Sequence, residues 1–515
     1  MSTQTWVETQ QVPGWGYSLR KLLPQAKSVG GRDVLVTSCC GNWRECRPND
    51  LYVAVEGSHE DGHDFAQNAI DQGASAIVGE RLLAVSAPQF IVEDSRIALG
   101  TICHALSGNP CQHLRTIGVA GTDGKTVISL LIDSILRHAN LNCAAATSLR
   151  GASDLWDQES PDIPDNSPSI AHWLGSVMAA GRSHAVLEIS SLTLAQHGLA
   201  GAQLDVAVLG NIRRDHLAFH GTAENYRDVQ SRVLKYLRPD GTLILNADDP
   251  TSRRLLDVVD VPALTVGIHQ PAEITASLLD RQLGLQTFLL TAGGDSAVVS
   301  TAMIGKHHIY NCLTAAAVGL ALGIDLPTVV AGIERLQPLP VRLECLSSHP
   351  FSVWLDSGRR TSQLAAAIQT IGQETRRRLH VVATIDGRSG SDQLRHLGHL
   401  LERVADQVTL TQDRAEPCYD YEPMHQVLDG FETPGQAMVI PNRWRAIEWA
   451  LSQAEPGDAV LVAGDGRVNV AVDGESPCWI TDRDVCQAWL SNRVGPRTDD
   501  DPGNESIHRL DDFRP

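Results

Sequence analysis

The stretch GVAGTDGKTV (118–127) combines a glycine-rich turn with a Lys-Thr pair. The apolar run 115–120 predicts a buried strand leading into the turn, and the amphipathic stretch 125–139 predicts a helix leading out of it. In a strand–turn–helix of this kind, backbone N–H groups and the helix N-terminus face phosphate oxygens. We therefore expect Lys125 to reach the phosphates of a nucleotide and Thr126 to ligate Mg²⁺.

This loop departs from the usual G-x-x-x-x-G-K-[ST] pattern. Val119 occupies a position where that pattern has glycine, and the glycines fall at 118, 121 and 124. Asp123 adds a carboxylate; at ~4 Å and an effective dielectric constant of about 20, it repels a unit negative charge by about 4 kcal/mol. We expect nucleotide binding that is weak or strictly dependent on Mg²⁺. An ordinary glycine-rich turn between a strand and a helix is the alternative.

The bulk composition restricts the class of protein. A chain of 515 residues is too long for one core and predicts two to four domains. Its formal charge of −19 excludes nucleic acid and anionic membranes as main partners. No apolar run approaches the roughly 18 residues of a membrane span, and the first residues lack the order of a signal peptide, so we expect a cytoplasmic protein.

The 11 cysteines contain no C-x-x-C pair, and their number is odd. Close cysteine pairs are typical of structural zinc, and an even count is typical of a secreted disulfide framework. We therefore expect reduced thiols.

Short β-rich runs alternate with helical patterns along most of the chain, which predicts parallel, helix-covered sheets. A connector near 107–115 and a junction near 336–344 divide the pattern. The polar, proline-rich stretch 154–169 reads as a loop, and the acidic end as a disordered tail. We predict an N-terminal α/β domain at 1–110, a central domain at 111–338, a C-terminal α/β domain at 339–492 and a tail at 493–515.

Five stretches in order resemble motifs of the Mur ligases. GTDGKT (121–126) is similar to G-T-N-G-K-T, with Asp123 at the asparagine. The others are LEISS (187–191), NIRRDHLAFHGTAENY (211–226), GKHHIYNCLTAAAVGLALGI (305–324) and PVRLE (340–344). Residues 49–80 resemble the uridine-binding first domain of the UDP-N-acetylmuramoyl-tripeptide ligases. The resemblance implies a three-domain α/β architecture, with a central P-loop parallel sheet and a Rossmann-like C-terminal domain.

The resemblance also implies a reaction. Family members use ATP and Mg²⁺ to join an amino acid to a UDP-N-acetylmuramoyl peptide through an acyl phosphate, in peptidoglycan synthesis, and we expect a monomer. By position, Lys125 would hold phosphates while Glu188 and His216 would join Thr126 as metal ligands. The implied nucleotide contacts are Gly121, Thr122, Asp123, Gly124, Lys125, Thr126, Asn311 at the adenine, and Arg342 and Asp356 at phosphate and ribose. The implied contacts to the muramoyl substrate are Asn166, Ser167, Ser190 and Gln196.

Several family positions are changed here. Gln230 stands where the family has a lysine that becomes carbamylated and bridges to a second metal ion, so we expect that ion to be weak or absent. In the third domain, the motifs that select the amino acid are replaced by DSGRRTS (356–362), IDGRSGSDQLR (385–395), QDRAEP (412–417) and GDGRVN (464–469).

Two functions therefore remain open: an active ATP-dependent ligase, and an impaired paralogue that binds a nucleotide or UDP-sugar in a regulatory role. An unrelated P-loop kinase is a weaker third, because nothing else in the chain looks like an acceptor site for a kinase.

Overall fold

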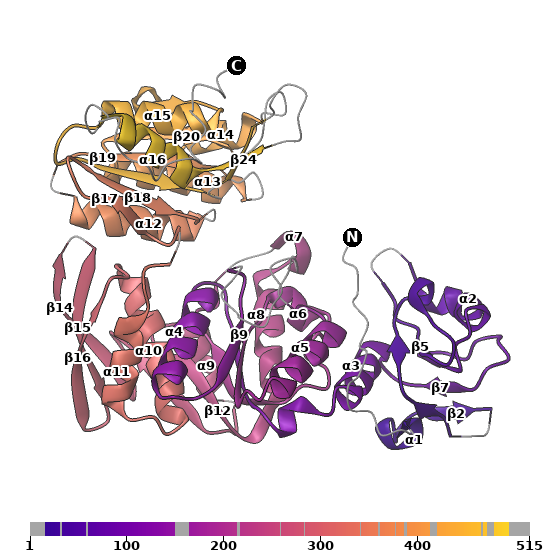
Figure 1. The fold of residues 1–515 in the computed structure, drawn as a ribbon. Coiled ribbons are helices and arrows are strands. Elements are labelled where there is room, and N and C mark those ends of the chain that lie inside the picture. The colour runs from indigo at the N-terminus through magenta and orange to yellow at the C-terminus, as the bar shows by residue number, and fades with distance from the viewer. Residues whose placement is uncertain are drawn as a thin grey trace, which may run out of the picture. The chain divides into compact units, whose positions relative to one another are not determined.

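The computed structural model contains three main sheets, in chain order indigo, magenta to salmon, and orange to yellow in Figure 1. Helices accompany each sheet, as the predicted α/β fold requires. The structure describes residues 16–30, 33–57, 60–149, 164–213, 217–257, 259–282, 284–339, 341–358, 361–375, 377–385, 389–412, 420–464, 467–470 and 478–493.

The first sheet has five strands in the order β2-β7-β6-β5-β4. Strands β4 to β7 pair in parallel, and β2 pairs with β7 antiparallel. The strands are β2 (Lys27–Val29), β4 (Cys39–Cys40), β5 (Leu51–Val53), β6 (Ala76–Gly79) and β7 (Gln89–Ile91). Next to them lie α1 (Leu19–Leu22), α2 (Ala66–Asp71), α3 (Ser95–Leu106) and the short pair β1 (Tyr17–Ser18) and β3 (Leu35–Val36).

The central sheet has nine strands in the order β16-β15-β14-β13-β12-β11-β8-β10-β9. From β9 to β14 every neighbouring pair is parallel. These strands are β8 (Arg115–Ala120), β9 (Cys143–Ala146), β10 (His184–Glu188), β11 (Leu204–Leu209), β12 (Leu237–Asn246), β13 (Ala263–Gly267), β14 (Ile274–Gln282), β15 (Leu285–Ala292) and β16 (Asp295–Thr301).

The helices of this middle region follow the predicted alternation. They are α4 (Lys125–His138), α5 (Ser167–Ala179), α6 (Ser191–Ala195), α7 (Leu217–His220), α8 (Ala223–Ser231), α9 (Pro250–Leu256), α10 (Lys306–Ala321) and α11 (Leu326–Arg335). Nearly all side chains of β8, β10 and β11 are buried, as expected for parallel strands covered on both faces.

The third sheet has six strands in the order β17-β18-β22-β19-β20-β21, parallel except at β17. The strands are β17 (Glu344–Ser347), β18 (Ser352–Asp356), β19 (Leu379–Thr384), β20 (Gln407–Thr411), β21 (Ala437–Val439) and β22 (Ala459–Ala463). With them lie α12 (Thr361–Glu374), α13 (Ser391–Val404), α14 (Glu422–Leu428), α15 (Arg443–Gln453), α16 (Asp482–Arg493) and the pair β23 (Arg467–Val470) and β24 (Cys478–Thr481).

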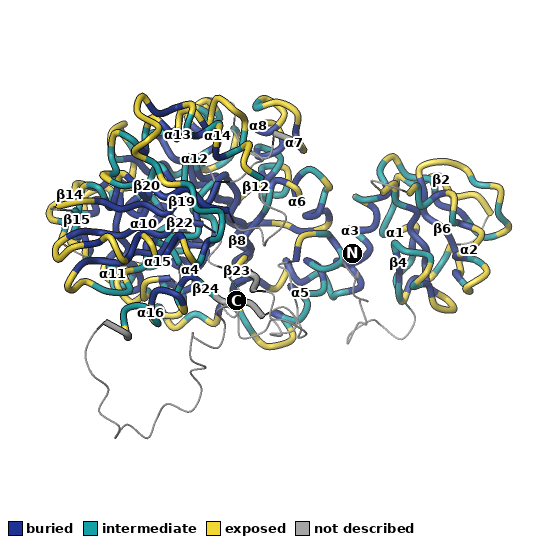
Figure 2. The backbone as a smooth tube through the Cα atoms, turned by 90° about the horizontal axis from the view of Figure 1, so that it is seen from above, coloured by how far each residue is buried: buried dark blue, intermediate teal, exposed yellow. Residues whose placement is uncertain are grey.

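The chain divides into two compact units, each with its own core. One comprises residues 1–277, 289–299 and 310–336, and the other residues 278–288, 300–309 and 337–515. The buried strands β8, β19 and β22 are dark blue in Figure 2. Among the described residues, no helix is both long and apolar enough to cross a membrane.

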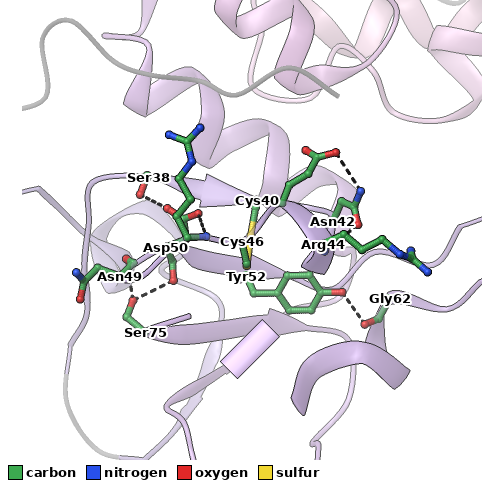
Figure 3. The surroundings of a disulfide bond; sticks show 12 residues. Ser38, Cys40, Asn42, Arg44, Cys46, Asn49, Asp50, Tyr52, Gly62 and Ser75 are labelled. Atoms are coloured by element: carbon green, nitrogen blue, oxygen red, sulfur yellow. Dashed lines mark hydrogen bonds between the residues drawn. A yellow bond between two sulfur atoms is a disulfide. The ribbon is translucent and has the colours of Figure 1, made fainter. Parts of the chain in front are cut away.

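Two expectations from the sequence are wrong. Cys40 and Cys46 form a disulfide, with their Cα atoms 5.8 Å apart, although we expected reduced thiols (Figure 3). The spacing of these cysteines did not reveal that the turn after β4 folds back on itself. The end of the predicted loop 154–169 is the second: residues 154–163 lie outside the described residues and 164–166 form neither helix nor strand, but Ser167 already begins α5. Asn166 caps that helix in a capping box with Ser169.

Candidate functional site

The glycine-rich turn lies at the carboxyl edge of the central sheet. In the register, Glu188 at the end of β10 pairs with Val119 of β8, and Leu209 at the end of β11 pairs with Ala120. The loops after three adjacent parallel strands therefore leave the sheet together. In open α/β sheets this edge is where ligands bind.

The backbone of the turn requires its glycines. Gly121 has φ +127° and Gly124 has φ +83°, both in the region that side chains disfavour. A Cβ on Gly121 would lie 3.1 Å from the backbone of Gly210, so the turn passes directly over the end of β11. The N–H of Thr122 donates to the carbonyl of Asn211 at 2.8 Å, which ties the turn to the next loop.

Lys125 begins α4, and its ammonium folds back over the turn. Its Nζ donates to the carbonyls of Gly121 and Thr122, each at 3.1 Å. The cation is thus held against the loop that we expect to carry phosphates. Asp123 lies half-buried in the same turn.

Thr126, Ser148 and Glu188 form a cluster of oxygen atoms next to the turn. The Glu188 carboxylate accepts from the Thr126 hydroxyl at 3.0 Å, from the Ser148 N–H at 2.9 Å and from the Ser148 hydroxyl at 3.3 Å. The two hydroxyls lie 2.8 Å from each other, and Glu188 is only 6% exposed. Carboxylate and hydroxyl oxygens are the donors that Mg²⁺ prefers, so this cluster suits that ion. Ser148 was missed, because a lone serine after an alanine-rich strand carries no motif.

Gln230 faces the backbone of the turn. Its side chain is fully buried, and its amide oxygen accepts from the N–H of Gly121 at 3.1 Å. Gln230 thus makes a specific contact with the loop, and the weakness or absence of a second metal ion stays a prediction. Tyr226, one helical turn earlier on α8, places its hydroxyl 2.8 Å from the Gln230 amide nitrogen and 3.1 Å from the Thr122 hydroxyl.

Asn311 of α10 lies against the turn at Gly124. A Cβ on Gly124 would come within 2.4 Å of its Oδ1, so the side chain occupies the space that this glycine leaves. The preceding residue, Tyr310, donates to Asp248 at 2.6 Å. Burial opposes ionisation of Asp248, but the Tyr310 hydroxyl and the N–H groups of residues 268–270 outweigh it and lower the pKa of this carboxyl.

The four expected substrate residues lie at helix ends. Asn166 caps α5 through the Ser169 N–H at 3.0 Å, and Ser167 is the first residue of that helix. Ser190 caps α6 through the Thr193 N–H at 3.0 Å, and Gln196 follows the last residue of α6. These residues thus have local structural roles, and contact with a substrate stays a prediction.

Arg342 and Asp356 belong to the other unit and lie beside each other there. Asp356 accepts from the N–H groups of Gly358 at 2.8 Å and Leu343 at 3.1 Å, and Arg342 donates to the Ser357 hydroxyl. Burial raises the pKa of Asp356, although these N–H groups and Arg342 oppose the shift. His216, expected at a second metal ion, lies outside the described residues.

Comparison with known proteins shows similarity along most of the chain. Residues 41–103 match the family model described as "Mur ligase family, catalytic domain", residues 119–319 the "Mur ligase middle domain" and residues 341–466 the "Mur ligase, glutamate ligase domain". A UDP-N-acetylmuramoyl-L-alanyl-D-glutamate–2,6-diaminopimelate ligase of Geobacillus kaustophilus is 31% identical over 466 residues, which cover 87% of this chain and 94% of that protein.

Solved structures share the fold. A UDP-N-acetylmuramoyl-L-alanyl-D-glutamate–2,6-diaminopimelate ligase superposes with a TM-score of 0.71 at 23% identity, covering 93% of this chain and all of that one. A MurF ligase from Thermotoga maritima, solved in complex with ADP, superposes with a TM-score of 0.59 at 21% identity over 83% of this chain and 93% of that one. The predicted three-domain α/β fold is thereby confirmed.

Proposed function

The chain belongs to the Mur ligase family, and from that premise we propose that it is an ATP-dependent ligase of peptidoglycan precursor synthesis. It would add an amino acid to a UDP-N-acetylmuramoyl dipeptide. The proposal includes an acyl phosphate on the substrate carboxylate, from which the amine of the amino acid displaces phosphate. Domain boundaries at 110, 338 and 492, a cytoplasmic location and a monomeric state are parts of the same proposal.

One observation carries this proposal: Lys125 and the Thr126–Ser148–Glu188 cluster lie at the same strand–turn–helix, where Lys125 and Thr126 are consecutive residues. A polyphosphate on the turn would meet the ammonium of Lys125, the N-terminus of α4 and a metal ion held by the oxygen cluster. The ADP complex of a MurF ligase supports the choice of nucleotide, and the name of the Geobacillus relative supports the substrate class.

In this reaction a substrate carboxylate must approach a negatively charged phosphate, and the two anions repel each other. The residues of this site would reduce that repulsion. Lys125 and the helix terminus are fixed positive charges that need no reorganisation when negative charge develops. Bound Mg²⁺ would neutralise phosphate oxygens, held by Thr126 and Glu188 with Ser148 beside them. We assign adenine contact to Asn311, phosphate and ribose contacts to Arg342 and Asp356, and a second metal position to His216.

A second candidate is a paralogue that binds nucleotide or UDP-sugar without ligation. The specific observation in its favour is Gln230, whose amide oxygen accepts from Gly121 N–H and offers no negative charge to a metal ion. The altered third-domain stretches, such as DSGRRTS (356–362), point in the same direction.

Phosphate release separates the two functions. The full chain would be incubated with ATP, Mg²⁺, UDP-N-acetylmuramoyl dipeptide and single amino acids, diaminopimelate and lysine first. Release that requires both the dipeptide and one amino acid supports the ligase. Absence of release with every amino acid, alongside measurable ADP binding, supports the second candidate.

Replacing Lys125 tests the nucleotide site itself. We expect Lys125→Ala to weaken binding of ATP by about 100-fold, because a charge-assisted hydrogen bond contributes up to about 3 kcal/mol. Isothermal titration with a non-hydrolysable ATP analogue and Mg²⁺ would measure the loss. Lys235→Ala, which removes an exposed lysine after α8, is the matched control. Equal affinity in Lys125→Ala and the parent chain would show that the turn is not the nucleotide site.

A further inference from the structure

Gln230 is a buried amide in direct contact with the glycine-rich turn. It is fully buried, and a buried amide must satisfy both of its ends to be tolerated. Here both ends are directed at Gly121, the first glycine of the turn after β8. The amide oxygen accepts from Gly121 N–H at 3.1 Å, and the amide nitrogen lies 3.4 Å from the Gly121 carbonyl oxygen.

The orientation of the amide follows from its partners. The backbone N–H of Gly121 can only donate, so it must face the oxygen of Gln230. The nitrogen then donates to the Tyr226 hydroxyl at 2.8 Å as well as facing the Gly121 carbonyl. Because Tyr226 and Gln230 are four residues apart on α8, they share one face of that helix.

Tyr226 extends the contact to the next residue of the turn. Its hydroxyl lies 3.1 Å from the hydroxyl of Thr122, which also accepts from the N–H of Arg213 at 2.9 Å. Thr122 is 3% exposed and Tyr226 is 1% exposed, so water does not compete for these groups. One face of α8 therefore holds two consecutive residues of the turn.

The same carbonyl connects Gln230 to the cation of the site. The Gly121 carbonyl oxygen accepts from Lys125 Nζ at 3.1 Å and faces the Gln230 amide nitrogen. Any change in the direction of this carbonyl moves an acceptor of the lysine. Gln230 thus fixes the orientation of the peptide groups before and after Gly121, whose φ is +127°. The carbonyl of the second peptide group in turn fixes the position of the Lys125 ammonium.

We propose that Gln230, with Tyr226, is a positioning residue of the nucleotide site, which holds the turn 121–122 and the Lys125 ammonium in the conformation that accepts a polyphosphate. This inference rests on the proposed function only in taking the ligand to be a nucleotide. It assigns Gln230 a role in the shape of the loop in place of a role as metal ligand.

Gln89 provides a matched control within the first sheet. It is 5% exposed, its amide oxygen accepts from Leu83 N–H at 2.9 Å, and its nitrogen donates to the Leu83 carbonyl at 2.9 Å. Gln89→Leu therefore removes the same kind of contact from a buried amide to one backbone residue, but in a different sheet.

The test compares Gln230→Leu, Gln89→Leu and the parent chain by two measurements. Hydrogen–deuterium exchange of the segment 118–126 reports on the turn without nucleotide, and titration with ADP and Mg²⁺ reports on the site. We expect Gln230→Leu alone to speed exchange in this segment and to raise the Kd for ADP about tenfold, while both variants lower the unfolding temperature. If Gln230→Leu does not fold, Tyr226→Phe replaces it, with an expected rise in Kd of about threefold.

If folded Gln230→Leu binds ADP as tightly as the parent chain does, the proposal is overturned. This holds even if hydrogen–deuterium exchange has become faster, because Gln230 then contributes to stability only. An equal loss of affinity in Gln89→Leu also overturns it. Failure of the parent chain itself to bind ADP is a different result and contradicts the proposed function.

Discussion

Single residues of the turn show how sterics and chemistry combine in this site. Gly121 and Gly124 adopt positive φ, Asn311 occupies the space next to Gly124, and Gln230 binds both backbone groups of Gly121. The glycines and Lys125 could be recognised from the sequence because their spacing has a direct mechanical reason. Ser148 could not, since it carries no motif and lies 22 residues from Thr126. Tyr226 ends the recognised motif 211–226, but its contact with Thr122, 104 residues away, was not predicted.

Replacement of Gly124 separates backbone strain from steric conflict. We expect Gly124→Ala to lose nucleotide binding and more than about 2 kcal/mol of stability. A left-handed conformation costs an alanine about 1–2 kcal/mol, and here its Cβ would also lie 2.4 Å from the Asn311 oxygen. Urea unfolding and titration with ADP would measure the two losses.

Gly323 offers the control, because its φ of +82° matches that of Gly124, at +83°, but a Cβ added at Gly323 would have no atom within 4 Å. Gly323→Ala should therefore show the conformational cost alone and keep its affinity for ADP. If both variants lost the same stability and both bound ADP, the close packing of Asn311 against the turn would not be needed for nucleotide binding.

At the scale of elements, the order and type of strands and helices were largely predictable. The run 115–120 is β8 and the predicted helix 125–139 is α4, which ends at His138, because apolar periodicity and helix-start signals agree there. The boundary at 154–169 failed, because the polar residues that suggested a loop include a helix cap. Asn, Ser and Pro at a helix start have the composition of a loop.

Asn166 is the residue at which a capping role and a substrate role can be separated. We expect Asn166→Ala to lower stability by about 1 kcal/mol, the usual cost of a lost N-cap, and Asn166→Asp to retain stability because a carboxylate also caps. We further expect Asn166→Asp to raise the KM for the UDP-muramoyl dipeptide about tenfold, since a new negative charge would repel an anionic substrate. Thermal unfolding and steady-state phosphate release would measure these effects.

Ser190→Ala serves as the comparison, because Ser190 caps α6 in the same way. It should lower stability to a similar extent. If the KM of Asn166→Asp equalled that of the parent chain, Asn166 would act only as a helix cap and would not contact the substrate.

At the scale of the whole molecule, the family fold was predictable while particular long-range contacts were not. Five motifs in the correct order identify the architecture, because a run of specific motifs in one order is very unlikely to arise by chance. The contact of Gln230 with Gly121, 109 residues away, and the ion pair of Arg115 with Asp205, 90 residues away, carry no such signal. Contacts of this kind depend on where the chain returns in space, which composition and local periodicity do not encode.

Buried histidines make the stability of the molecule dependent on pH, and His104 is the clearest case. It lies in α3 at 2% exposure, and in the part of the chain that the structure describes neither ring nitrogen has a hydrogen-bond partner. Burial lowers its pKa from 6.5 to about 4. Between about pH 6.5 and 4, His104 therefore binds a proton in the unfolded chain but stays neutral in the folded chain. The free energy of unfolding is thus unaffected by His104 above pH 6.5 and decreases as the pH falls to 4.

We expect the loss to reach about 3 kcal/mol at pH 4, at about 1.4 kcal/mol per pKa unit. His104→Leu should flatten the decrease in unfolding free energy between about pH 7 and 4 by that amount relative to the parent chain, as measured by urea unfolding at each pH. His113→Asn, at an exposed histidine, is the control for the loss of a histidine as such. Parallel pH profiles for His104→Leu and the parent chain would mean that His104 is protonated in the folded protein, and hence that water reaches α3.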